Sequence, residues 1–508
     1  MIPLIVAFPL IMAFLTSILP ALRKEKFSKY IFLLGMLSPW ILLPQIIENL
    51  PFNEIVGNWN RILGIEVAAD NYNLPFIMAE LILSAFVALY VYGNYYPKKI
   101  ENKAYVLLLL LHAGLLGAFI SRDLFNYYIY MEIASVASFA LVGISKEKGA
   151  RRAAFKYAIF SLLASYIFIL GIGIIYLKTG YLNLALIKEN LRMSREINAA
   201  LALAFTSLLL KSGIFPLHFW LPDAHSKADA PISALLSGLV VKAPAYGMIL
   251  LTLTFPIGIF VQRTLLTLAF FSMFFGIAMA ILQKNSERLL AYHTISQMGY
   301  VLLGIALLNP LGAAYYALAH ALFKGGLFLS VGTIAEHYNT RDLGKLSYRS
   351  SKPLAIAIIL LSLAIGGISP FIGAFGKSKI SEGLQGVLEY LFYIGGIGTL
   401  VSFTKLNYYL SKRKEKAELP RKKAVIPLLL GTLTLVGGIY LYPHLNILKD
   451  LSSIAMAFIL FYLLKNLGVF EISTEAFIPE QFSSLGKEIN AYMFLFTALL
   501  LLFLLNFL

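Results

Sequence analysis

The 508-residue sequence has no cysteine and few charged residues. Without cysteine, the chain cannot form disulfides or supply thiolate ligands to zinc or to an iron–sulfur cluster. Charged residues make up 13% of the sequence, whereas soluble domains carry about a quarter. Long polar linkers and low-complexity tracts are lacking too. These absences exclude a string of soluble domains and leave a single membrane domain as the simplest interpretation.

Motifs for cofactors are also missing. No Walker or G-x-G-x-x-G motif follows a predicted strand, and no His, Asp and Glu residues have the spacing of metal ligands. We therefore predict no cofactor, no metal site and no redox centre in this chain. The net charge of +16 does not indicate binding to nucleic acid, because the basic residues lie in short segments between apolar runs.

Apolar runs long enough to cross about 30 Å of hydrocarbon recur along the whole sequence. We predict an all-α polytopic membrane protein with about 14–16 transmembrane helices. The candidate spans are, in order, Ile2–Leu22, Tyr30–Ile47, Leu74–Tyr92, Ala104–Ile120, Leu124–Ile144, Ala153–Leu177, Ala199–Phe219, Pro231–Phe255, Ile257–Leu282, Leu289–Leu308, Gly312–Ala335, Pro353–Phe375, Val387–Leu410, Val425–Tyr442, Ser452–Phe470 and Ile489–Leu508. The basic segment 186–198 is expected to form a short interfacial helix.

Loop charges predict the orientation of these spans. Basic segments such as RKEKFSK, KEKGARR, KNSER and KRKEKAELPRKK follow odd-numbered spans, whereas the loop 48–73 after the second span has Arg61 as its only cation and four acidic residues. The positive-inside rule then places the odd-numbered loops in the cytoplasm and the N-terminus outside. We predict a multi-pass protein of the cytoplasmic membrane.

Two predicted spans combine helix breakers with a lysine. The seventh contains Lys211, Gly213 and Pro216, and the twelfth contains Pro370, Gly373 and Lys377. They are five helices apart, so they would run in opposite directions, and such paired interruptions indicate an inverted repeat. A break frees backbone groups that only protein or water can satisfy, which predicts a hydrated pocket beside the lysine.

Few ionisable side chains lie well inside the predicted spans, and each costs about 2.5–3.5 kcal/mol to insert. They are Glu132, Lys211, Lys242, His320, Lys324 and Lys377. Glu132 and Lys211 have opposite charges: within about 4–6 Å each favours the charged form of the other, and separation favours the neutral forms. Such a lysine can take up and release a proton. His320 and Lys324 are four residues apart and share one helix face.

Structural roles remain open for the same residues. Glu132 and Lys211 could form a buried ion pair, Lys242 lies among small residues that suit helix packing, and His320 could bond across helices. Lys377 could extend towards an interface. His112 is interpreted as a hydrogen-bonded core histidine and His293 is left open between core and function. The remaining three side chains are expected near span ends, where interfacial roles are common: Glu80, Lys156 and Lys405.

Several segments resemble one known family. They are LLLKSGIFPLHFWLPDAHSKADAPISALLSGLVVKAPAYG, SRDLFNYYIYMEIASVASFALVG, ERLLAYHTISQMGYVLLGIAL, HALFKGGLFLSVGTI and GISPFIGAFGKSKI. Together they are similar to the antiporter-like subunits of respiratory complex I, to the D-type subunits of multisubunit cation/proton antiporters, and to the corresponding subunits of membrane-bound hydrogenases and sulfane sulfur reductases. The resemblance spans roughly residues 104–410 in the same order.

The resemblance implies two inverted five-helix repeats, helices 4–8 in residues 104–255 and helices 9–13 in residues 256–411, with broken helices 7 and 12. Helices 1–3 would occupy residues 1–103 and further helices residues 412–508. It also implies a proton relay along the membrane midplane made of Glu132, Lys211, Lys242, His320, Lys324 and Lys377. Tyr316 departs from the pattern, because some members carry a second histidine there.

The sequence favours a proton-translocating subunit of a larger membrane complex. Its partners would be other membrane subunits, including antiporter-like and quinone- or hydrogenase-module neighbours, together with the lipid bilayer. The transported ion is either H⁺ alone or H⁺ in exchange for Na⁺, and the sequence leaves these two alternatives open. The alternative is a stand-alone Na⁺/H⁺ or small-solute transporter, which would need acidic oxygen ligands near the breaks, where lysines lie instead. A purely structural scaffold would need no buried titratable residues.

Overall fold

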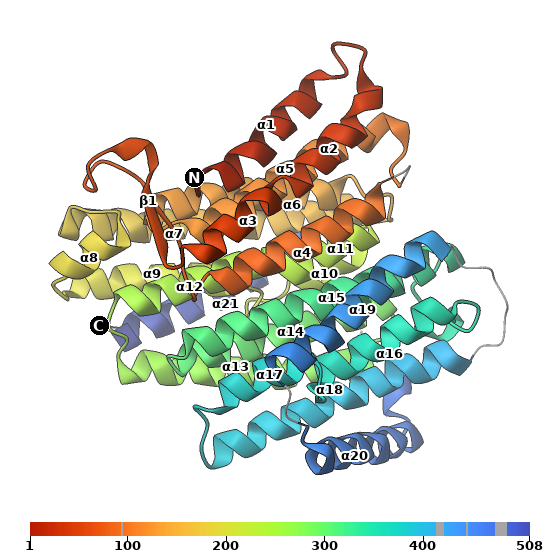
Figure 1. Cartoon of the computed structure of the whole chain (residues 1–508). Helices are drawn as coiled ribbons and strands as arrows, with labels where there is room; N and C mark the ends of the chain where they lie inside the picture. Colours follow the sequence, from red (N-terminus) through yellow and green to blue (C-terminus); the bar gives the residue numbers. More distant parts are fainter. Residues whose placement is uncertain (93–94, 413–420, 443–444, 473–484, 508) are drawn as a thin grey trace. The chain divides into compact units, whose positions relative to one another are not determined.

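The computed structural model describes residues 1–92, 95–412, 421–442, 445–472 and 485–507 (Figure 1). Among these, thirteen helices are long and apolar enough to cross a membrane. The sheet found in them is one antiparallel hairpin of β1 (Phe52–Ile55) and β2 (Glu66–Ala69), which pairs Phe52 with Ala69. The prediction of an all-α polytopic membrane protein is therefore confirmed. Most of the basic segment 412–423 lies outside the described residues.

The chain forms two compact units, each of which is described by itself. Unit 1 comprises Met1–Gly213, Leu239–Thr264 and Met493–Leu508. Its helices are α1 (Leu4–Ile18), α2 (Ser28–Leu37), α3 (Pro39–Glu48), α4 (Leu74–Val91), α5 (Lys98–Ile120), α6 (Leu124–Gly143), α7 (Ala150–Thr179), α8 (Leu184–Asn190), α9 (Arg195–Lys211) and α12 (Lys242–Thr254).

Unit 2 comprises Ile214–Gly238 and Leu265–Tyr492. Its helices are α10 (Leu221–Lys227), α11 (Ala230–Leu235), α14 (Ser286–Ala306), α15 (Pro310–Tyr338), α16 (Lys352–Gly366), α17 (Ile372–Ser381), α18 (Val387–Lys412), α19 (Arg421–Leu441) and α20 (Ile447–Asn466). Two further helices, α13 (Ile259–Leu282) and α21 (Leu485–Phe507), belong partly to each unit. The predicted repeats are continuous stretches of sequence, whereas the two units are defined by spatial compactness. The units therefore do not test the repeat boundaries, which stay a prediction.

Both predicted breaks are present. In the predicted seventh span, α9 ends at Lys211, and the next helix, α10, begins at Leu221, just beyond the predicted end of the span. The twelfth span divides into α16, which ends at Gly366, and α17. Each break contains a glycine in the left-handed region, Gly213 at φ 67° and Gly367 at φ 81°. Glycine adopts this conformation without the steric cost that a side chain would bring, so both glycines permit the chain to turn where the helix stops.

The expected interfacial helix over 186–198 is only partly correct. Helix α8 ends at Asn190, and Arg195 begins a separate helix, α9. Ser194 separates the two helices because its hydroxyl accepts a hydrogen bond from the Ile197 N–H at 3.3 Å. A serine in this N-cap position satisfies a backbone donor that the helix leaves free, and so it starts a new helix.

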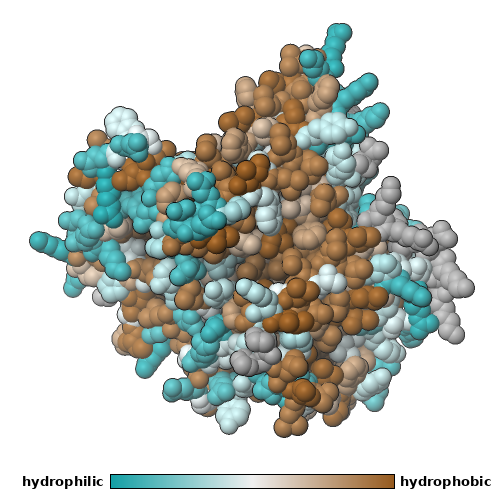
Figure 2. Space-filling view, in the orientation of Figure 1, coloured by the Kyte–Doolittle hydropathy of each residue, from teal (hydrophilic) through white to brown (hydrophobic). Residues whose placement is uncertain are grey.

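Hydrophobic side chains cover much of the face drawn in Figure 2. Large apolar residues are strongly exposed on several helices, for example Ile41 (76%), Tyr440 (85%) and Leu448 (84%). Exposed apolar surface on this scale is unfavourable in water and favourable in hydrocarbon. Most of the ionisable side chains predicted as site residues are instead buried inside the two units.

Candidate functional site

Lys211 is surrounded by polar side chains inside unit 1. Its Nζ is 2.7 Å from Oε1 of Glu132 on α6, and it also donates to the hydroxyls of Ser135 on α6 at 3.1 Å and Ser161 on α7 at 3.2 Å. Ser165 donates to the same carboxylate oxygen. An ammonium has three donors and no acceptor, so the three oxygens satisfy it completely. The pair is sheltered, with side-chain exposures of 5% for Lys211 and 19% for Glu132.

The local sequence explains why these side chains meet. Lys211 is the last residue of α9, where the carbonyl dipoles of the helix favour a positive charge. Ser161 and Ser165 are four residues apart and share one face of α7. Helix α7 approaches α9 closely at Gly171, where an added Cβ would lie 2.9 Å from the Ala200 carbonyl oxygen. The break after Lys211 and the small residues of α7 therefore place the serines around the ammonium.

Lys242 belongs to the same unit. Helix α11 continues through a π-helical turn, Leu236–Val240, into α12, and Lys242 is the first residue of α12 with 1% of its surface exposed. Tyr127 of α6 anchors this turn, because its hydroxyl donates to the Ala243 carbonyl at 2.8 Å. π-helical turns are rare and occur often at functional sites. Unit 1 thus buries three of the predicted residues: Glu132, Lys211 and Lys242.

Unit 2 buries the other three predicted residues. Lys324 of α15 donates to the Leu290 carbonyl of α14, and Tyr316 of α15 donates to Gln297 of α14. The numbers rise along α14 as they fall along α15, so the two helices are antiparallel. The same register places His320 level with His293. Both histidines are fully buried.

His293 was left open from the sequence, and the structure gives it a distinctive environment. Neither ring nitrogen has a hydrogen-bond partner among the residues that the structure describes. Its ring packs against Phe403 at a centroid distance of 4.7 Å. A buried polar group without a partner costs about 1–3 kcal/mol and is explained in native proteins by a catalytic role or by a bound water.

One face of α14 links two of the predicted lysines. Leu290, His293, Gln297 and Tyr300 follow one another at intervals of three or four residues and therefore line one side of the helix. The stripe is about 15 Å long at 1.5 Å per residue. At the first residue of the stripe, the Nζ of Lys324 donates to the Leu290 carbonyl. At the last residue, the Nζ of Lys377 lies 4.9 Å from the centre of the Tyr300 ring.

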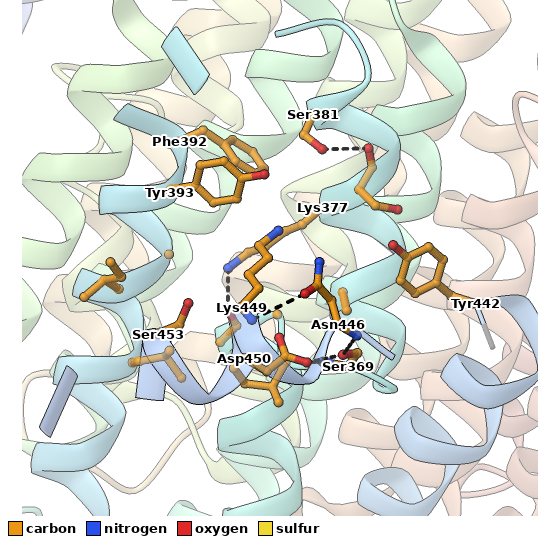
Figure 3. Close-up of a pocket in the computed structure, with 18 residues that line it drawn as sticks. Ser369, Lys377, Ser381, Phe392, Tyr393, Tyr442, Asn446, Lys449, Asp450 and Ser453 are labelled. Carbon is orange, nitrogen blue, oxygen red and sulfur yellow. Dashed lines mark hydrogen bonds between the residues drawn. The ribbon is translucent and has the colours of Figure 1, made fainter. Parts of the chain in front are cut away.

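Lys377 follows the second break (Figure 3). Its Nζ donates to the carbonyl oxygens of Gly366 at 2.9 Å and Ile365 at 3.3 Å, at the C-terminal end of α16. These carbonyls have no partners within the helix and carry its negative dipole end. Gly367 permits this approach, since a Cβ there would lie 2.6 Å from Cδ of Lys377.

The three side chains expected near span ends are all buried inside the protein, with 0% of Glu80, 3% of Lys156 and 2% of Lys405 exposed; their closeness to a membrane interface stays a prediction. Lys405 donates to the carbonyls of Ile281 and Gln283 at 2.6 and 2.7 Å, at the end of α13. Glu80 bonds to Nδ1 of His112 at 2.8 Å. Glu80 lies six residues inside its predicted span, so its depth was a usable signal. No sequence signal shows that the end of α13 covers Lys405.

The fold and these buried groups define a class of protein. Polytopic helical proteins with titratable residues inside the membrane and with helices broken beside them move ions or protons. A family model described as "NADH:quinone oxidoreductase/Mrp antiporter, TM" matches residues 121–403. The chain belongs to this family.

Curated relatives agree with this membership. The chain is 31% identical to the D-type subunit of the Na⁺/H⁺ antiporter of Bacillus subtilis over 75% of its own length and 79% of the relative's. It is 32% identical to the N-type subunit of the NADH-quinone oxidoreductase of Desulforudis audaxviator over 78% of its own length and 87% of the relative's.

Two solved structures have the same fold. One is a chain of the membrane-bound sulfane sulfur reductase, an archaeal respiratory membrane complex, with a TM-score of 0.80, 24% identity and coverage of 91% of this chain and 99% of that one. The other is a chain of the Mrp complex of a Dietzia species, with a TM-score of 0.75, 22% identity and coverage of 92% and 99%.

Proposed function

We propose that this chain is the antiporter-like, proton-translocating subunit of a multisubunit ion-translocating membrane complex. The observation that carries the proposal is the Lys211 ammonium, which is buried and saturated by Glu132, Ser135 and Ser161. A charge held this way inside a membrane helix bundle is a functional site by default. The relatives named above as antiporter and quinone oxidoreductase subunits support the same assignment.

The chemistry at Lys211 follows from its pairing with Glu132. While the 2.7 Å contact is made, each side chain favours the charged form of the other. When the contact opens, burial favours neutral lysine, and the proton leaves the amine. When the contact closes again, the amine takes up a new proton. The helix break after Lys211, where Gly213 adopts a left-handed conformation, permits the small movement that this cycle needs.

The other predicted residues carry protons onward. In this proposal, Lys242 continues the path from Lys211, and His320, Lys324 and Lys377 form its second part. The stripe on α14 joins Lys324 to Lys377 through His293, Gln297 and Tyr300. Water held by the unpartnered nitrogens of His293 would complete the chain of hydrogen bonds, because a buried water needs two to four polar neighbours.

Partner subunits supply the energy in this proposal. They are membrane subunits of the same complex, antiporter-like neighbours or quinone- or hydrogenase-module subunits, and an opposing Na⁺ gradient is the other source. We further propose that residues 104–255 and 256–411 are inverted repeats, which the paired glycine breaks after Lys211 and Gly366 support. The N-terminus would lie outside and the odd-numbered loops in the cytoplasm.

Replacing Lys211 with alanine tests the function. We expect loss of the ion gradient formed by the assembled complex in vesicles, measured with a pH-sensitive dye, while the co-purified subunits stay unchanged. Lys178→Ala is the matched control, since Lys178 forms an exposed 2.8 Å pair with Glu196 in the same unit. Normal pumping by Lys211→Ala would refute the proposal. Robust exchange by the purified chain alone in liposomes would favour a stand-alone transporter.

A further inference from the structure

A pocket opens beside the second helix break, between α16, α17, α18 and α20 of unit 2 (Figure 3). Its volume is about 80 Å³, and a water molecule needs roughly 10–15 Å³ of such space. It therefore has room for several waters. The polar groups that line it include Ser369, Lys377, Tyr442, Asn446, Lys449 and Asp450.

Lys377 offers a proton to this pocket. Two of its three donors are used by the carbonyls of Gly366 and Ile365, and the third has no hydrogen-bond partner among the described residues. Because Lys377 lines the pocket, water there can accept the remaining hydrogen bond. Lys377 thus lies beside both the pocket and the Tyr300 end of the α14 stripe.

Asp450 stands on the opposite wall, in the first turn of α20. Its Oδ2 accepts hydrogen bonds from the Ser369 backbone N–H at 3.1 Å and from the Ser369 hydroxyl. No hydrogen bond within the described residues uses its Oδ1, and the side chain is half-buried. One oxygen therefore fixes the carboxylate on the break, while the other is available to water.

Lys449 adds a positive charge at the outer side of the pocket. It is exposed, and its Nζ lies 4.3 Å from the centre of the Tyr393 ring. Like charges around one small space disfavour a second charged ammonium, so Lys449 favours release of the proton from Lys377. The carboxylate of Asp450 opposes this effect and attracts the released proton. The phenols of Tyr300, Tyr393 and Tyr442 also face this region.

We propose that this pocket is the vestibule through which Lys377 exchanges protons with the aqueous phase, and that Asp450 is the proton acceptor at its mouth. The Lys377 ammonium gives its proton to pocket water, water passes a proton to the Asp450 carboxylate, and the carboxylic acid releases it to bulk water. The reverse sequence reloads Lys377. This inference rests on the proposed function, and it assigns a role to the C-terminal helix α20.

Thiol labelling tests the vestibule without relying on transport. The natural chain has no cysteine, so a single introduced cysteine is the only target in this chain. Ala374 lines the pocket, whereas Ala364 is fully buried on α16 outside it. In vesicles that contain the whole complex, we expect Ala374→Cys to react with a charged, membrane-impermeant thiol reagent at least about tenfold faster than Ala364→Cys. Equal, slow labelling of both would overturn the vestibule.

Substitution of Asp450 tests the acceptor. A positioned acid–base group contributes roughly 100-fold to proton transfer, and water replaces part of that, so we expect Asp450→Asn to slow gradient formation about tenfold. Asp450→Glu should restore most of the rate. Ser369→Ala removes the hydroxyl that holds the carboxylate and should have a smaller effect, with Asp450 still able to ionise.

The outcomes separate the two proposals. If Lys211→Ala abolishes pumping but Asp450→Asn pumps as fast as the wild type, the role of Asp450 is wrong and the proposed function stands. If Asp450→Asn and Asp450→Glu are equally slow, the carboxylate acts only as a structural link to Ser369, and the acceptor role is overturned. If Lys211→Ala pumps normally, the proposed function fails, whereas the labelling result still decides whether the vestibule exists.

Discussion

The Lys211 ammonium has three protons and three oxygen acceptors, which is the condition for keeping a charge inside a membrane protein at all. The serines matter as much as the carboxylate. Ser135 and Ser161 are small enough to lie between packed helices, and they supply the two hydrogen bonds that Glu132 leaves unfilled. The site is therefore stable when closed and unfavourable when Glu132 moves away.

A double-mutant cycle on this pair measures their coupling. Removing one partner of a buried ion pair costs about 3–5 kcal/mol, so Glu132→Ala should lower the free energy of unfolding by up to about that amount. The double variant Glu132→Ala with Lys211→Ala should lose less than the sum of the single variants. Denaturant unfolding of the detergent-solubilised protein measures each value.

The exposed pair Lys379 and Glu382 is the control for this cycle. Its side chains are 40% and 60% exposed at a distance of 2.8 Å, and surface pairs contribute only about 0–1 kcal/mol. The same cycle there should give little coupling. Additive effects at Glu132 and Lys211 would contradict the assignment of a tightly coupled buried pair.

At the scale of elements, one face of α14 would connect separate residues into the proposed proton path. Lys324 and Lys377 come from different helices, and no local sequence pattern indicates that the two lysines lie near the same helix. Helix α14 brings them to the two ends of one stripe through the Leu290 carbonyl and the Tyr300 ring. Between them, His293 is the titratable group of that stripe.

Replacing His293 with leucine tests this stripe. We expect transport by the complex to fall about tenfold or more, because a positioned proton-transfer group is lost. Stability should stay equal or rise, because an unsatisfied buried polar group costs about 1–3 kcal/mol. Gradient formation and thermal unfolding are measured on the same preparation. His337→Ala, at an exposed position on α15, should alter neither; unimpaired transport by His293→Leu would remove this residue from the path.

At the scale of the whole molecule, apolar surface and loop charge determine how the chain lies in a membrane. Strongly exposed side chains such as Leu448 and Tyr440 suit lipid. The basic loops act through the cost of moving their charges across the bilayer. Each compact unit contains its own group of buried titratable residues, so the proposed proton relay has one part in each unit.

The proposed orientation has a direct test in the cysteine-free chain. Lys148 and Asn60 are both exposed, in loops that follow the fifth and the second predicted span. We expect Asn60→Cys to react with an impermeant thiol reagent added to whole cells, and Lys148→Cys to react only after the membrane is permeabilised. The opposite pattern would invert the topology.

Much of this protein follows from sequence alone. Apolar length predicted the spans, and the glycines and prolines after Lys211 and before Lys377 predicted both breaks, because local backbone chemistry decides where a helix can continue. Glu132 and Lys211 were expected to pair from their signs and their depth. These inferences need only periodicity, charge and the cost of placing an ion in hydrocarbon.

The tertiary structure decided the rest. Three features depend on which helix faces meet. They are the burial of Lys405 under the end of α13, the hydrogen bond between Glu80 and His112, and the position of His293 at the same height as His320. Helix packing brings together residues that are tens to hundreds of positions apart, and an apolar helix has no strong preference among apolar neighbours. The vestibule at Lys377 likewise exists only because α20 places Asp450 against Ser369, a contact across 81 residues that no local pattern encodes.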